Sequence, residues 1–138
     1  MITKIERQSL INLMCKNFDG NDFLITVTYD NEHLPQNFED ALNDARNYMR
    51  RVSHRCKQQG LPKPKYFSVT DYLHFHHHIL VSCGIEQDDL AELWSKKGQA
   101  LGFTKVTTGN NVMDVVNYMV LHHMDRFSVR TIRSRMDR

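Results

Sequence analysis

Four of the eight histidines in this 138-residue chain fall within residues 74–78. Side chains alternate between the two faces of a β-strand, so a strand here puts His74, His76 and His78 on one face and His77 on the other. Imidazoles that alternate in this way can converge on one cation, although a structural or surface role is the ordinary alternative. Asp71 offers a carboxylate as third ligand and His74 is its rival, so the pattern predicts a site for Mn²⁺ or Mg²⁺, with zinc left open.

Tyr118 is the second residue whose position suggests chemistry. It lies in a predicted helix over residues 111–124, on the polar side of that helix. Asp114 and His122 stand four residues before and after Tyr118 and share its side of the helix. Because a free phenol has a pKa of about 10, a nucleophilic tyrosine needs such hydrogen-bonding neighbours. The alternative is an amphipathic tyrosine that covers the edge of a sheet.

The elements that must position these residues follow from hydrophobic periodicity and turn signals. A leading helix within residues 1–20 would turn Ile5, Leu10, Leu13 and Met14 inward, and a long helix begins after Pro35 and ends at Gly60. The other predicted elements are a central strand at residues 23–29, two strands at 66–71 and 74–82 joined by a hairpin around Tyr72 and Leu73, a helix at 86–97 and a strand at 101–107.

The element order is βαββαβ, with one further helix at the end. With right-handed crossovers, this order predicts an α+β fold of the ferredoxin-like kind: an antiparallel sheet with two helices on one face. The Tyr118 helix is expected against the other face. A length of 138 residues predicts a single domain over residues 1–138, of which residues 126–138 form a basic tail.

The net charge is only +2, but the basic residues are unevenly distributed. Residues 46–65 contain seven basic side chains and no acidic one, which fits either a solvated helix face or a track for a phosphate backbone. The candidates for DNA contacts are Arg46, Arg50, Arg51, Arg55, Lys63 and Lys65.

Composition excludes several other classes of protein. No apolar stretch reaches the length of a membrane helix, and the three cysteines form no paired motif, so we expect a cytoplasmic protein without disulfides. There is no glycine-rich phosphate loop with a lysine, which argues against an ATPase motor within this chain.

Taken in chain order, these residues resemble the HUH endonucleases, and within them the rolling-circle replication initiators of bacterial plasmids and phages. The resemblance runs from about Asn17 to His122. Its pieces are Asn17-Phe18 with Asp22, the strand at residues 23–29 (FLITVTY), Asp71, residues 76–82 (HHHILVS), Leu93-Trp94 and Tyr118.

The resemblance implies that His76 and His78 bind a divalent metal ion, Mn²⁺ or Mg²⁺, that polarises the scissile phosphate. Tyr118 would then attack single-stranded DNA, leaving a 5′-phosphotyrosine link and a free 3′-hydroxyl, as in the single-tyrosine members. The chain departs from the family at two positions. Leu121 stands where relatives usually carry a lysine, with His122 as the substitute catalytic residue, and the shorter Asp71 stands where they carry a glutamate.

The expected partner is single-stranded DNA or a DNA hairpin in a bacterial host cell, with a host helicase as a further partner and no membrane or small-molecule cofactor. Rolling-circle initiation is the preferred context, and relaxases and transposases use the same chemistry. Two other functions stay open. One is a non-catalytic single-strand-binding module on the same sheet, and the other is an interaction module whose histidines are incidental.

Overall fold

The computed structural model describes residues 3–71 and 73–123, and the side chains of residues 3–71 and 73–119. The predicted basic tail, residues 126–138, lies outside this range. No helix in the described part of the chain is long and apolar enough to cross a membrane.

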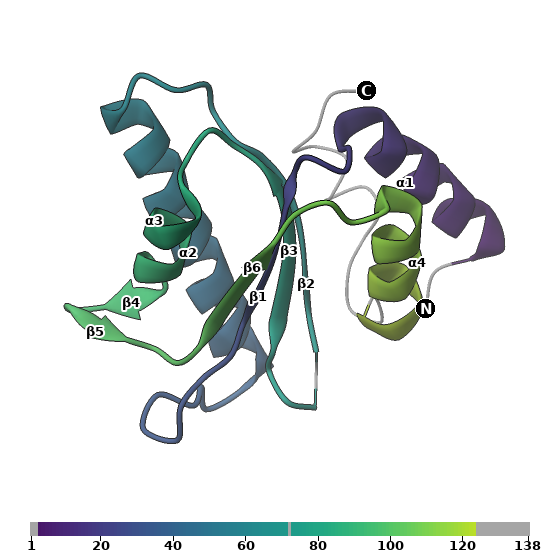
Figure 1. The fold of residues 1–138 in the computed structure, drawn as a ribbon. Helices are drawn as coiled ribbons and strands as arrows, with labels where there is room; N and C mark the ends of the chain where they lie inside the picture. The colour runs from purple at the N-terminus through teal and green to yellow at the C-terminus, as the bar shows by residue number, and fades with distance from the viewer. Residues whose placement is uncertain (1–2, 72, 124–138) are drawn as a thin grey trace.

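A four-stranded antiparallel sheet forms the centre of the fold (Figure 1). Its strands are β1 (Phe23–Val27), β2 (Lys65–Thr70), β3 (His77–Ser82) and β6 (Thr104–Thr107), in the order β2-β3-β1-β6. The β-branched and aromatic residues of β1 suit a strand with a neighbour on each side, and its predicted central position is confirmed. The α+β class and the antiparallel sheet are confirmed with it.

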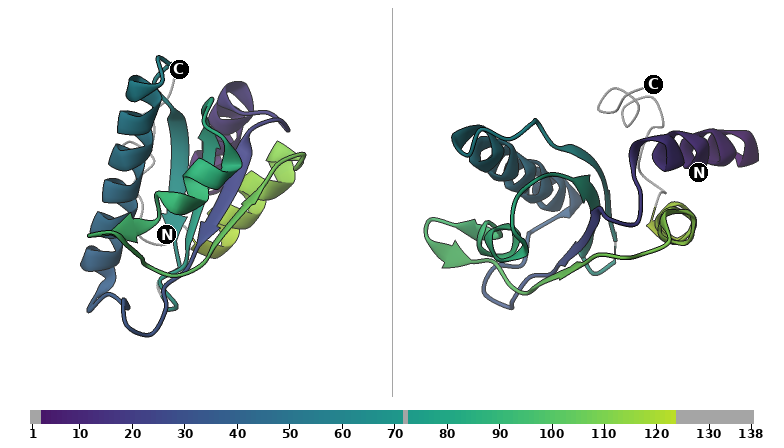
Figure 2. Two further views of the ribbon diagram at one scale, coloured as in Figure 1. Left: turned by 60° about the vertical axis from the view of Figure 1, so that its left-hand side comes forward. Right: turned by 45° about the horizontal axis from the view of Figure 1, so that its top comes forward.

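Helices cover both faces of the sheet (Figures 1 and 2). Helices α2 (Phe38–Gln58) and α3 (Gln87–Glu92) lie on one face, and α1 (Lys4–Asn17) and α4 (Val112–His123) lie on the other. Strand alternation divides the core in the same way, because Ile79 and Val81 pack with α2 and α3 whereas Leu80 packs with α1 and α4. The sheet therefore has two distinct faces, and His78 shares its face with Leu80.

The two longest helices begin at side-chain caps. Thr3 and Glu6 form a reciprocal capping box at the start of α1, and Asn37 accepts a hydrogen bond from the Asp40 N–H at the start of α2. The predicted long helix is confirmed. In α1, Leu10 and Met14 are buried as predicted, but the prediction for Ile5 is wrong, because its side chain is 83% exposed.

The prediction of one strand over residues 74–82 is wrong at its start, because β3 begins only at His77. The connection between β2, which ends at Thr70, and β3 is longer than predicted, and the predicted turn residue Tyr72 lies outside the described residues. The Asp71 carboxylate accepts from the Leu73 N–H at 2.9 Å, and the Phe75 N–H donates to the Asp71 carbonyl at 2.8 Å. Such local bonds compete with strand pairing, and Phe75 adopts a φ of 57°. His74 consequently stands in a turn, and His76 lies between that turn and β3.

The predicted helix over residues 86–97 is also too long, since α3 ends at Glu92. The chain continues as a small hairpin of β4 (Ser95–Lys96) and β5 (Gln99–Ala100). Trp94 is drawn into the core, where its indole N–H donates to the Thr28 carbonyl at 2.9 Å. That burial redirects the chain, and Lys96 lies in a strand of the hairpin instead of a last helical turn.

Gly102 marks a close approach between two segments just before β6. A Cβ atom at this position would overlap the backbone carbonyl of Thr28. The predicted strand over residues 101–107 accordingly narrows to Thr104–Thr107, although the Thr28 N–H still donates to the Phe103 carbonyl at 2.9 Å.

Candidate functional site

Tyr118 is placed by the helix that carries it. Asn111 caps α4 by accepting from the Asp114 N–H at 3.2 Å, and the apolar side of the helix buries Val116 and Met119 against α1 and the sheet. The Tyr118 side chain is left 52% exposed, on the polar side as predicted.

A hollow of about 340 Å³ lies between the Tyr118 side of α4 and the sheet. From α4 it is lined by Asp114, Val115, Tyr118 and Met119, and from the sheet by Leu24, Thr26 and His78. The rings of His78 and Tyr118 meet edge to face, with their centroids 6.1 Å apart and their planes at 88°. The structure thus brings together two predicted site residues that are far apart in the sequence.

His78 is half-buried in β3, and its Nδ1 lies 3.4 Å from the Thr26 hydroxyl oxygen. A hydrogen bond to one ring nitrogen fixes the tautomer and orients the other nitrogen for use as a ligand or base. Thr26 was not among the predicted site residues. Strand alternation in residues 23–29 could have identified it, because Thr26 lies between the buried Ile25 and Val27 and must face the other side of the sheet.

The remaining predicted metal ligands lie in the turn before β3. The His74 Nδ1–H donates to the Asp71 carboxylate at 3.0 Å, so the two rival third ligands bond to each other. The rings of His74 and His76 are 5.7 Å apart between centroids. Within the described residues, no three His, Cys, Asp or Glu side chains gather closely enough to hold a metal ion. His76 and His78 offer imidazole nitrogens as metal ligands, but no third ligand among the described residues is close enough to complete a site with them.

His77 faces the core, as predicted, and takes part in a buried chain of hydrogen bonds. Its Nδ1 lies 2.7 Å from the Thr70 hydroxyl and its Nε2 lies 2.8 Å from the Tyr29 hydroxyl, which in turn donates to the Asp44 carboxylate at 2.9 Å. Since Tyr29 gives its single proton to Asp44, we assign the His77 proton to Nε2, with Nδ1 accepting from Thr70.

We call these four hydrogen-bonded residues, Thr70, His77, Tyr29 and Asp44, the His77 network. Burial is the largest cause of the pKa shifts of His77 and Tyr29. It lowers the pKa of His77 to about 3, with a smaller contribution from the neighbouring His78 and His76. Burial also raises the pKa of Tyr29, as does its carboxylate partner Asp44. A neutral His77 is therefore linked to β2, to the segment that follows β1 and to α2. The strand pattern predicts that His77 faces the core, but it does not predict the hydrogen-bond partners of its ring.

The predicted DNA-binding arginines lie on α2, across the sheet from Tyr118 (Figure 2). The Arg51 Nε–H donates to the Leu93 carbonyl at 2.8 Å, and Arg55 forms an ion pair with Asp89 at 3.2 Å. These two side chains hold α3 and the segment after it against α2. Arg46 and Arg50 are exposed and donate to asparagines of their own helix, Asn43 and Asn47.

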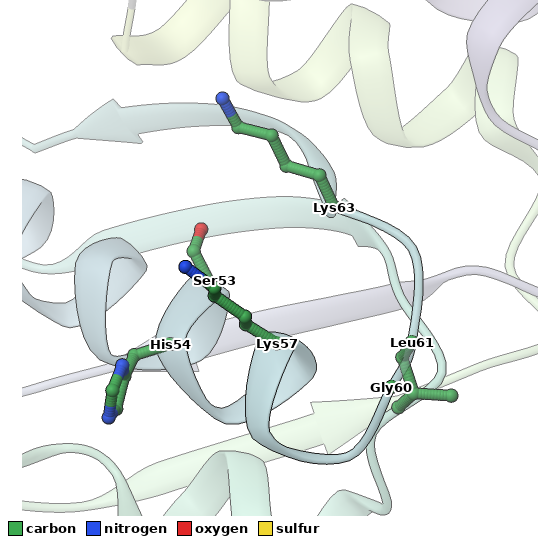
Figure 3. A pocket seen from close by; sticks show the side chains of 6 residues that line it. All are labelled: Ser53, His54, Lys57, Gly60, Leu61 and Lys63. Carbon is green, nitrogen blue, oxygen red and sulfur yellow. The ribbon is translucent and has the colours of Figure 1, made fainter.

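A second hollow, of about 570 Å³, lies at the C-terminal end of α2 (Figure 3). Lys57 and Lys63 line it together with Ser53, His54, Gly60 and Leu61, and Figure 3 shows His54 directed away from Lys63. Lys65, the last of the predicted DNA contacts, is half-buried at the start of β2. This hollow gathers basic groups but no tyrosine or carboxylate, whereas the hollow at Tyr118 has both.

The predicted catalytic His122 lies in α4, but its side chain is outside the described residues, as is that of Leu121. The expected proximity of the His122 and Tyr118 side chains therefore stays a prediction.

No protein-family model matches the chain, and no curated protein matches it. Among solved structures, the chain is similar to the hypothetical protein ORF119 from Sulfolobus islandicus rod-shaped virus 1. The TM-score is 0.49 at 12% sequence identity, over 88% of this chain and 96% of the viral chain.

Proposed function

We propose that this protein is a metal-dependent enzyme that nicks and rejoins single-stranded DNA, with Tyr118 as its nucleophile. The observation that supports this function best is the hollow in which the Tyr118 and His78 rings meet at 6.1 Å. An exposed phenol beside an imidazole and a carboxylate, Asp114, is a set of groups suited to phosphoryl transfer.

In the proposed reaction, the Tyr118 oxygen attacks the phosphorus of a DNA phosphodiester. A bond forms between that oxygen and phosphorus, and the bond from phosphorus to the 3′-oxygen breaks. The phenolic proton passes to the Asp114 carboxylate in the hollow, and the departing 3′-oxygen takes a proton from water. The products are a 5′-phosphotyrosine and a 3′-hydroxyl, and the reverse reaction rejoins the strand because the bond energy is conserved in the phosphotyrosine link.

The proposed metal ion is Mn²⁺ or Mg²⁺, held by His76 and His78. When bound, such an ion polarises the scissile phosphate as a Lewis acid. Asp71 or His74 would complete the ligand set, and either would have to give up the hydrogen bond that now joins them. Thr26 serves as a positioning residue, because its hydroxyl lies beside Nδ1 of His78.

The fold is consistent with this proposal. We assign it to the ferredoxin-like arrangement, because the order β2-β3-β1-β6 is the one that two right-handed crossovers and a central hairpin produce. The preferred context is rolling-circle replication initiation, with relaxases and transposases as users of the same chemistry.

The test is cleavage of a pool of end-labelled single-stranded oligonucleotides in the presence of Mn²⁺. We expect His78→Ala to abolish cleavage, while His54→Ala, which removes an exposed histidine on α2 across the sheet, leaves the rate unchanged. EDTA should stop the reaction, so cleavage that persists in EDTA would contradict the metal-ion part of the proposal. Equal cleavage by the His78→Ala variant would contradict the assigned site.

A non-catalytic single-strand binder is the second candidate. The bond between Asp71 and His74 favours it, because it engages the two candidate third ligands with each other. This alternative predicts salt-sensitive binding that chelation does not change, with no cleavage by any variant.

A further inference from the structure

The register of the sheet places Lys105 in the same cross-strand row as His78. Thr26 of β1 pairs with His78 of β3 on one side and with Lys105 of β6 on the other. Residues directly opposite each other in an antiparallel pair project to the same face. Since neighbouring strands are about 4.8 Å apart, the Cα atoms of His78 and Lys105 are separated by roughly 10 Å across that face.

Phe103 continues this surface along β6. Its carbonyl accepts from the Thr28 N–H, so strand pairing extends to this residue. Side chains alternate, which puts Phe103 on the same face as Lys105, roughly 7 Å further along the strand. The Phe103 side chain is 78% exposed and Lys105 is also exposed, so neither α1 nor the described part of α4 covers this end of the sheet.

We propose that Phe103 and Lys105 bind the single-stranded segment next to the cleavage point, with Lys105 on a backbone phosphate and Phe103 stacked on a base. This inference rests on the proposed function only for the position of the cut. The evidence for the binding surface itself is the sheet register, the exposed ring of Phe103 and the positive charge of Lys105.

The chemistry of the pair favours single-stranded nucleic acid as the occupant. An exposed phenylalanine beside a cation matches the two features of a single strand that are independent of sequence, namely a π-face on every base and a charge on every phosphate. In a duplex the base faces are stacked within the helix and cannot reach Phe103. The acidic Asp114 lies on α4, and β6 (TKVT) itself carries no acidic residue beside Lys105.

The experiment measures binding of an oligothymidylate of about 10 nucleotides, a length within the usual site sizes of small single-strand binders. Fluorescence anisotropy is recorded with the full chain carrying Tyr118→Phe, so that binding is separated from covalent attachment. Phe103→Ala is expected to weaken binding by roughly 5- to 150-fold, the range for loss of one stacked base. Phe103→Trp should retain the affinity.

Two further measurements make the result specific. Ile5→Ala removes a side chain that is likewise apolar and highly exposed, but on α1, and should leave the affinity unchanged. Lys105→Ala should lower the slope of log affinity against log salt concentration by about 0.7, the value for one phosphate contact on a single strand.

The Phe103→Trp variant also gives a direct signal. The natural Trp94 is buried, so an exposed tryptophan at position 103 is a distinct emitter that stacking on thymine should quench. Absence of quenching, equal affinity of the Phe103→Ala variant, or no binding by any variant would overturn the inference. Loss of affinity in a protein that never cleaves DNA would support it while contradicting the proposed enzyme.

Discussion

Removing the Tyr29 hydroxyl is expected to destabilise the fold more than removing any single surface contact. In the His77 network this hydroxyl accepts from the Nε2–H of His77 and donates to Asp44. Phenylalanine preserves the ring that packs edge to face against Trp94 at 5.3 Å between centroids. The Tyr29→Phe variant therefore isolates the contribution of the hydroxyl group to the free energy of unfolding.

The magnitude follows from what stays buried. Tyr29→Phe leaves the Nε2–H of the fully buried His77 without an acceptor, which costs about 2 kcal/mol within the usual range for an unsatisfied buried donor. Asp44 is half-buried and can form a hydrogen bond to water in place of the one to Tyr29. The loss of the Tyr29–Asp44 bond therefore adds up to about 1 kcal/mol. We expect a total of about 2 to 3 kcal/mol.

Tyr48→Phe is the matched control. The Tyr48 hydroxyl is also buried, but it donates to one acceptor only, the Leu90 carbonyl at 2.6 Å. Its loss leaves no buried donor without a partner and should cost about 1 kcal/mol. Urea denaturation would compare the free energies of unfolding of the two variants, provided that the slope of this free energy against urea concentration is the same for both. A loss for Tyr29→Phe no greater than that for Tyr48→Phe would refute the proposed proton order of the network.

Three other outcomes are expected. Gly102→Ala should cost about 2 kcal/mol or more in urea denaturation, because its Cβ would overlap a neighbouring backbone carbonyl, whereas Gly20→Ala, whose Cβ would lie 3.3 Å from its nearest neighbour, should cost less. Arg55→Ala should cost less than about 1 kcal/mol and leave oligothymidylate binding unchanged, since it breaks a partly exposed ion pair across the sheet from Tyr118; weakened binding would contradict this placement. His33 donates to Asp30, which raises its pKa, so the stabilisation from this pair is complete at low pH and is lost as pH rises through the raised pKa. NMR titration should show the pKa of His33 falling in the Asp30→Asn variant, and no change would contradict the assignment.

The parts of the fold that follow from local patterns were predictable. The β-branched and aromatic residues at 23–29 predict a central strand, and the spacing of apolar residues after Pro35 predicts α2. The order of elements then limits the sheet to few topologies. The boundaries of the histidine strand were not predictable, because the side chain of Asp71 bonds within the turn and competes with strand pairing.

Some members of the candidate site were predictable, but its geometry was not. Residue types identify Tyr118 and His78, and only the packing of α4 on the sheet shows that their rings meet. Charge clustering suggested Arg51 as a DNA contact, yet its guanidinium binds the Leu93 carbonyl after the chain folds. Phe103 lacks any sequence motif, and its exposure follows from tertiary structure alone.

The most direct test of the proposed function is the chemical identity of a protein–DNA adduct. The protein is incubated with Mn²⁺ and a pool of labelled single-stranded oligonucleotides, denatured in SDS, digested and analysed by mass spectrometry. We expect a nucleotide linked through its 5′-phosphate to the peptide that contains Tyr118, and no adduct with Tyr118→Phe. An adduct on another residue, or no adduct in any pool, would contradict the assignment of Tyr118 as the nucleophile.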